Sequence, residues 1–141
     1  MGLKLYKKGG SGYYLGYGGF NTLRCVVAKA FDEKFGEVYS MPVIAPTEAQ
    51  RKGYSQKLHK AAIAANKRGN LPAWVWNEFL NASDCEGVVS PVTCQLIYDK
   101  VKDIKDAPLY GYMAQDDPFD HNQFVALLKE CIEHNSELAW E

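Results

Sequence analysis

The stretch that decides the fold is residues 3–36, LKLYKKGGSGYYLGYGGFNTLRCVVAKAFDEKFG. It begins with two short apolar or aromatic runs, Leu3–Tyr6 and Tyr13–Tyr17, on either side of the lysine- and glycine-rich residues 7–12. Such an intervening segment has the composition of a hairpin loop or of a mobile connection. We therefore expect an antiparallel hairpin at this end of the chain.

The second half of the same stretch has the pattern of an α-helix. Apolar side chains recur at helical spacing and would share one face: Leu23, Val26, Val27, Ala30 and Phe31. Asn21 is suited to cap the start of this helix, because its side chain can accept from the amides of the first turn. Gly36 can end the helix in a left-handed conformation.

Residues 37–70 predict an extended segment followed by a basic helix. Glu37–Ile44 is typical of a short strand or extended piece, and Thr47 and Gln50 have the spacing of a capping box. A narrow apolar stripe follows at helical spacing: Tyr54, Leu58, Ala61, Ala62 and Ala65. Four cations lie along its flank: Lys57, Lys60, Lys67 and Arg68. Gly69 is expected to end this helix.

Residues 71–141 predict three more helices and a closing strand. Pro72 is expected at the first helical position of the first helix, and the cap-then-proline pairs Ser90-Pro91 and Asp117-Pro118 precede the other two. The expected elements are a short buried helix over Leu71–Leu80, a helix from Pro91 to about Lys105, a loop or strand over Ala107–Gln115, a last helix after Pro118 and a strand over Leu138–Trp140.

The composition places these elements in one small domain. The chain has 141 residues, of which 47% are hydrophobic, and no linker or internal repeat divides it. We expect a single α+β domain over residues 1–141, in which a small antiparallel sheet, made by the N-terminal hairpin and the C-terminal strand, packs against four or five helices.

The net charge of −1 gives no indication of a histone-like polyanion binder, but it hides a division of the chain. Up to Asn70 there are 12 basic and 4 acidic residues, and from Leu71 onward there are 4 basic and 13 acidic ones. Either the fold brings the two halves together, or it presents a two-faced surface. The second case would permit self-association through opposite charges.

Two absences in the sequence indicate a cytoplasmic protein without a membrane partner. No apolar run approaches the roughly 20 residues that span a bilayer, and Met1–Tyr6 leads into lysines without the core of a signal peptide. The four cysteines are far apart and have no metal-site spacing, so we expect reduced thiols. Cys94 and Cys131 fall on apolar helix stripes and are expected in the core.

The turn Asp84-Cys85-Glu86-Gly87 is the first candidate for chemistry. Its carboxylates could contact a divalent cation or another ligand, and Cys85 could be a nucleophile, although neighbouring carboxylates disfavour the thiolate. The structural alternative is an Asx-type turn in which Asp84 accepts backbone amides and Gly87 takes a positive φ.

The second candidate is residues 116–121, DDPFDH, which combine oxygen ligands with an imidazole. The spacing matches no EF-hand loop, and carboxylates before a helix are explained by capping and by the helix dipole. His121 shares a helical face with apolar residues and would come near Asp84 or Glu86 only if those loops meet. Otherwise it is a structural histidine.

The third candidate is the glycine-rich approach to the first helix. Free amides at a helix start can bind an anion, and Arg24 would be the counter-charge, with Tyr13 and Tyr17 stacking on a base. The ligand-binding residues of this hypothesis are Tyr13, Tyr17, Gly18, Gly19, Asn21 and Arg24, joined by Lys57 and Lys60 of the basic helix. The glycines fit neither dinucleotide-binding nor Walker spacing, so we expect no cofactor of either type and no metal. The alternative is a structural hairpin followed by a cap.

Several segments in order resemble an uncharacterised family of small bacterial and phage-borne proteins. They are residues 1–6, MGLKLY, residues 19–24, GFNTLR, residues 83–91, SDCEGVVSP, and residues 124–131, FVALLKEC. The central Ser-Asp-Cys-Glu-Gly signal with its Ser-Pro is the most specific part, and Thr47–Asn70 has no counterpart. The resemblance implies a single cytoplasmic domain from a mobile element, and it supplies no catalytic residues.

These observations favour a binding or interaction protein over an enzyme. The leading hypothesis is that the glycine- and tyrosine-rich N-terminal region and the basic helix hold a nucleotide or an acidic protein surface, with nucleic acid as a weaker case. The second is a small hydrolase or transferase that uses Asp84, Cys85 and Glu86 with His121. The third is a structural, self-assembling protein.

Overall fold

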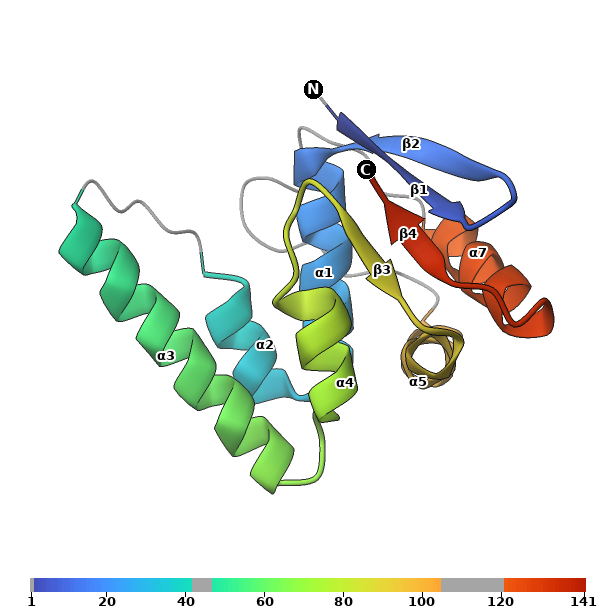
Figure 1. Cartoon of the computed structure of the whole chain (residues 1–141). Coiled ribbons are helices and arrows are strands. Elements are labelled where there is room, and N and C mark those ends of the chain that lie inside the picture. Colours follow the sequence, from blue (N-terminus) through green and yellow to red (C-terminus); the bar gives the residue numbers. More distant parts are fainter. Residues whose placement is uncertain (1, 42–46, 105–120) are drawn as a thin grey trace.

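A computed structural model describes residues 2–41, 47–104 and 121–141 (Figure 1). Four strands form one antiparallel sheet in the order β2-β1-β4-β3: β1 (Gly2–Lys7), β2 (Gly12–Gly16), β3 (Gly87–Val89) and β4 (Leu138–Trp140). The predicted hairpin is β1 and β2, and the closing strand β4 pairs with β1. The α+β fold is therefore confirmed.

Alternation along the strands gives the sheet a buried face and an open face. Leu3, Leu5, Val89 and Trp140 point into the core, where helices pack against them, while Tyr14 on the other face is 80% exposed. Within the described residues, no helix is long and apolar enough to cross a membrane.

Helix α1 (Tyr17–Phe31) begins directly after β2 and passes behind the sheet (Figure 1). Its N-cap is Gly16, so the prediction that Asn21 caps it was wrong. The helix takes in Gly18 and Gly19 because packing decides its start: Gly19 and Phe20 are already buried against the core. Asn21 instead lies within the helix and donates to Cys25 Sγ at 3.8 Å.

The sequence predicted that Gly36 ends the first helix, and this prediction was wrong. Helix α1 ends before Asp32, whose side chain caps α2 (Glu33–Tyr39) by accepting from Phe35 N. Gly36 lies inside α2, where an added Cβ would come 2.5 Å from the Lys29 Cα. The glycine therefore permits close packing of α2 on α1. The expected extended segment at Glu37–Ile44 was wrong for residues 37–39, which are helical; residues 42–46 lie outside the described residues.

Helix α3 (Glu48–Lys67) forms as predicted. Thr47 caps it by accepting from Gln50 N at 3.2 Å, and Gly69 follows its end with φ of 78°. Its apolar stripe packs against α2, and Ala62 and Ala65 are buried. Figure 1 shows that α3 lies at the side of the molecule away from the sheet.

The apolar block that follows α3 forms a short helix, which starts as an α-helix and continues as a π-helix. Pro72 precedes α4 (Ala73–Val75), which continues as the π-helical segment η1 (Trp76–Leu80). Pro72 occupies the N-cap and not the first helical position, but the buried helix is there as expected. The helix packs against the core through its buried side chains, Val75, Phe79 and Leu80.

The last two described helices, α5 (Pro91–Val101) and α7 (His121–Glu133), pack against each other. Ser90 caps α5 with Pro91 in its first turn, as predicted, but the helix ends before the expected Lys105. Cys94 and Cys131 are buried between the two helices. The expectations for Ala107–Gln115 and for Asp117-Pro118 lie outside the described residues.

Candidate functional site

Arg24 is a structural residue, contrary to its expected role as a counter-charge for an anion. Its side chain is 7% exposed, and its Nη2 donates to the carbonyl oxygens of Phe79 at 2.8 Å, Ala82 at 2.7 Å and Ser83 at 3.2 Å. Phe79 belongs to η1, and Ala82 and Ser83 follow it. The last carbonyl groups of a helix have no hydrogen-bond donor within the helix. Burial lowers the pKa of Arg24, but the guanidinium remains a strong donor. Arg24 thus caps a helix end.

The aromatic surroundings of Arg24 support the same conclusion. The guanidinium carbon lies 4.7 Å from the ring centre of Phe20, 5.6 Å from that of Trp140 and 5.7 Å from that of Phe79. A cation placed among three rings is shielded from solvent anions and stabilised by their faces. Sequence reasoning missed this environment because the rings come from three distant segments.

The other residues of the predicted anion site lie on three different elements, β2, α1 and α3. Tyr17, Gly18 and Gly19 form the first turn of α1, where Thr22 Oγ1 donates to Gly18 O at 3.0 Å. Tyr13 and Tyr17 are half-buried and pack against the core. No acidic or basic side chain stands in that first turn to select an ion. Lys57 and Lys60 lie on α3, away from this turn.

The turn at Asp84–Glu86 is exposed and makes short-range contacts. Cys85 N donates to Ser83 Oγ at 3.1 Å, and Cys85 Sγ donates to Asp84 Oδ1 at 3.4 Å. Gly87 has no positive φ and begins β3, which corrects the expected turn geometry. Its small size serves a different purpose, because an added Cβ would meet the Trp140 ring.

His121 lies beside Val101, at the end of α5 that is farther along the chain from this turn. It is buried at the start of α7, and its Nε2 donates to Val101 O at 2.9 Å, at the far end of α5. An 11-residue helix is about 16 Å long, so α5 separates His121 from the strand that follows the turn. Among the described residues, no group of three histidine, cysteine or acidic side chains could hold a metal.

Three of the four thiols are buried, and the hydrogen bond between Cys94 and Cys131 lowers the pKa of Cys131, whereas the pKa values of the other two are raised. Burial raises the pKa of Cys25, and the hydrogen bond with Cys131 together with burial raises the pKa of Cys94. A raised pKa disfavours the thiolate that nucleophilic chemistry requires. Cys85 alone among the cysteines is exposed.

The strongest candidate surface for a partner is on α3, and we call Lys52, Lys57, Lys60 and Lys67 the α3 basic face. All four are exposed, and at 100° per residue they fall within an arc of about 140° on one side of the helix. The described residues place no carboxylate within 4.0 Å of them. The only acidic residue in α3 is Glu48. Lys57, Lys60 and Lys67 were predicted on this flank together with Arg68, but Arg68 pairs with buried Asp32 at 2.7 Å.

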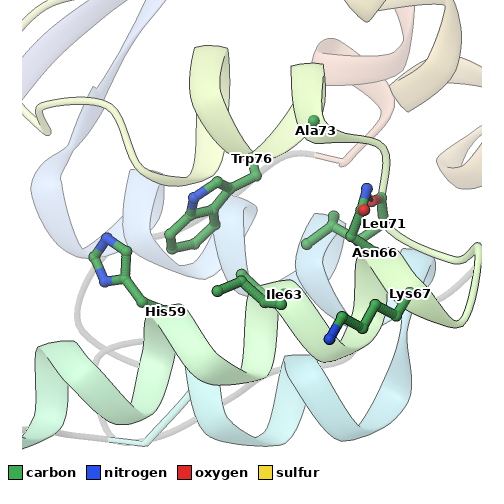
Figure 2. A pocket seen from close by; sticks show the side chains of 8 residues that line it. His59, Ile63, Asn66, Lys67, Leu71, Ala73 and Trp76 are labelled. Carbon is green, nitrogen blue, oxygen red and sulfur yellow. Dashed lines mark hydrogen bonds between the residues drawn. The ribbon is translucent and has the colours of Figure 1, made fainter.

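A groove between α3 and α4 borders this basic face, and we call it the α3–α4 groove (Figure 2). It has a volume of about 260 Å³ and is lined by His59, Ala62, Ile63, Asn66, Lys67, Leu71, Ala73 and Trp76. Ile63 is 57% exposed. Sequence reasoning missed the groove, although Ile63, an apolar residue outside the stripe of α3, was a usable signal.

The open face of the sheet is a weaker candidate. Lys4 lies between Tyr6 and Tyr14, 5.5 Å and 5.9 Å from their ring centres. The neighbouring part of that face carries Glu86 and Glu141, whose negative charges would repel a phosphate chain.

Searches against known protein families, curated proteins and solved structures found no match to this chain.

Proposed function

We propose that this protein is a binding protein that holds an acidic partner protein through the α3 basic face. The observation that carries the proposal is the set of four exposed lysines with no carboxylate within ion-pair distance in the described part of the chain. Like charges on neighbouring turns destabilise a helix by about 0.2–0.5 kcal/mol for each pair. Carboxylates of a partner would relieve this repulsion and steer the encounter.

The neighbouring groove favours a protein partner over a nucleic acid. Interfaces between proteins combine an apolar core with a polar rim, whereas a phosphate backbone requires only cations along its path. The basic face borders apolar groove residues, among them the exposed Ile63. This combination fits an acidic protein surface that also offers apolar side chains.

The test reverses two charges of the basic face and measures binding to poly-L-glutamate over a range of salt concentrations. We expect the double variant Lys57→Glu/Lys60→Glu to weaken binding about tenfold or more, since a tenfold loss corresponds to about 1.4 kcal/mol. Binding by the wild-type protein should weaken as salt rises, because the contacts are exposed ion pairs.

The matched control is Lys102→Glu/Lys129→Glu, which changes the net charge equally on α5 and α7. Both lysines make exposed ion pairs, at 3.9 Å to Asp99 and to Glu133, and Lys102 also lies 5.7 Å from the ring centre of Tyr98. This control should keep binding within about twofold of wild type. Equal loss in both double variants, or no binding of poly-L-glutamate at low salt, would overturn the proposal. Tighter binding of an oligothymidylate that Lys57→Glu/Lys60→Glu abolishes would assign the face to nucleic acid instead.

A further inference from the structure

We propose that the α3–α4 groove receives a bulky apolar side chain of the acidic partner, so that the recognised segment is acidic and carries an aliphatic or aromatic anchor. This inference rests on the proposed function and names the chemistry of the partner more closely. It is carried by the shape of the groove, its apolar lining and the position of the cations around it (Figure 2).

The floor of the groove is apolar and held in place. Ala62 and Leu71 are 4% and 1% exposed, and Asn66 Nδ2 donates to Leu71 O at 2.9 Å, which ties α3 to the segment before α4. The Trp76 ring packs edge-on against Phe35, with ring centres 5.8 Å apart. A groove with fixed walls loses little conformational entropy when a ligand enters it.

His59 closes one end of the groove beside Trp76. Its ring lies 5.4 Å from the Trp76 ring, at an interplanar angle of 86°. Its Nδ1 donates to Ser55 O at 2.8 Å, since a carbonyl can only accept. This bond orients the imidazole and leaves its Nε2 for a polar group of a partner.

The volume of about 260 Å³ decides the size of the occupant. Pockets for drug-sized molecules usually have about 300–1,000 Å³, so this groove is smaller than most of them. One or two amino-acid side chains are of the right size. Burying a leucine or phenylalanine side chain contributes about 1.5–3 kcal/mol, which is enough to anchor a flexible segment.

The charges around the groove complement an acidic segment. Lys60 precedes Ile63 by three residues and Lys67 follows it by four, and residues at these spacings are neighbours on a helix surface. The lining residues include no carboxylate. A segment whose anchor packs beside Ile63 would therefore place flanking carboxylates near Lys60 and Lys67.

The test compares two synthetic peptides of equal length and charge. Both are rich in glutamate; one has a central phenylalanine and leucine, and its twin has serine at both positions. The wild-type protein should bind the apolar peptide about tenfold more tightly than the twin, the gain expected for one buried side chain. The fluorescence maximum of the protein should shift with that peptide only, because Trp76 is shielded from water.

The variant Ile63→Ser separates the two proposals, with Val92→Ser on α5 as its matched control. Ile63 and Val92 are 57% and 58% exposed, so neither change removes core packing. In Ile63→Ser the two peptides should bind alike and as weakly as the twin binds wild type, whereas Val92→Ser should keep the difference. Equal binding of both peptides to wild type would overturn the groove inference and leave the proposed function standing. No binding of either peptide at low salt would overturn both.

Discussion

Asp32 joins three helices through one carboxylate. Oδ1 accepts from Phe35 N at 2.8 Å and from Arg68 Nη2 at 2.7 Å, while Oδ2 accepts from Arg68 Nε at 2.9 Å and from Asn70 Nδ2 at 3.0 Å. It thereby ends α1, caps α2 and holds the C-terminal end of α3. Arg68 holds the pKa of this carboxyl well below its ordinary value, against the opposing effect of burial.

The lowered pKa of Asp32 predicts a defined loss of stability in acid. Because the folded pKa lies below the unfolded value of about 3.9, the stabilisation is complete above that pH and is lost as the pH falls through the folded pKa. Asp32→Asn keeps a good N-cap but removes the charge, so it should lower the free energy of unfolding by about 1.5–3 kcal/mol at pH 7.

Urea denaturation between pH 7 and pH 2 measures this effect. The stability of wild type should fall more steeply below about pH 4 than that of Asp32→Asn. The exposed Asp99→Asn is the control and should follow wild type. Identical slopes in wild type and Asp32→Asn would show that Asp32 does not carry the acid sensitivity.

At the scale of the element, two helical glycines have opposite roles. Gly36 in α2 packs so closely on α1 that a Cβ would come 2.5 Å from the Lys29 Cα and 2.9 Å from its backbone nitrogen. Gly53 in α3 has no neighbouring atom within 4 Å of the same position. From the sequence, Gly36 was expected to end the first helix and Gly53 to weaken the start of its helix.

Gly36→Ala should therefore destabilise the protein, and Gly53→Ala should stabilise it. The first change forces α1 and α2 apart, at a cost of about 1–3 kcal/mol that exceeds the gain in helix propensity. The second should raise the free energy of unfolding by about 0.4–1 kcal/mol, because alanine loses less backbone freedom on folding. Thermal unfolding followed by circular dichroism distinguishes them; equal shifts in both variants would contradict the close packing of α1 and α2.

At the scale of the whole molecule, the charge division of the sequence is partly internal. Lys7 pairs with Glu130 at 3.4 Å, and Lys8 pairs with Glu137 at 3.3 Å, so basic residues of the first half meet acidic residues of the second. These contacts remove the Lys7–Lys8 loop from the set of unpaired cations. On α3, by contrast, the four lysines of the basic face have no carboxylate within 4.0 Å in the described part of the chain.

The sheet also joins the two ends of the chain, because β4 lies between β1 and β3. Trp140 is 1% exposed, packs against Phe20 and Phe79, and donates from Nε1 to Ser83 O at 3.0 Å. Trp140→Ala should cost about 3–5 kcal/mol of stability through the cavity it leaves.

The exposed Trp74→Ala is the matched control for this change. Trp74 is 56% exposed, so its removal should stay within about 0.5 kcal/mol of wild type. Urea denaturation followed by circular dichroism measures both variants. A Trp140→Ala protein as stable as Trp74→Ala would contradict the central place of β4 in the fold.

Capping residues made several helix starts predictable from the sequence. The prediction failed where contacts between distant segments decided the structure. Thr47 and the Ser90-Pro91 pair marked helix starts that the structure has, because a cap acts within one turn. Asn21 had the same local signal, but burial of Gly19 and Phe20 moved the helix start to Tyr17. The same holds for the candidate site. Lys57 and Lys60 were found from the helical period of one segment, but the groove beside them was not, because two segments form it.

The sequence by itself determined the α+β class, the hairpin, the basic helix and the burial of Cys94 and Cys131, since periodicity and capping depend on neighbours in the chain. Only the tertiary structure decided what Arg24, Gly87 and Trp76 do. Arg24 donates to a carbonyl 59 residues away, Gly87 lies beneath the ring of Trp140, and Trp76 forms a groove wall with α3. The partners of these residues come from other segments, and only folding brings them within contact distance.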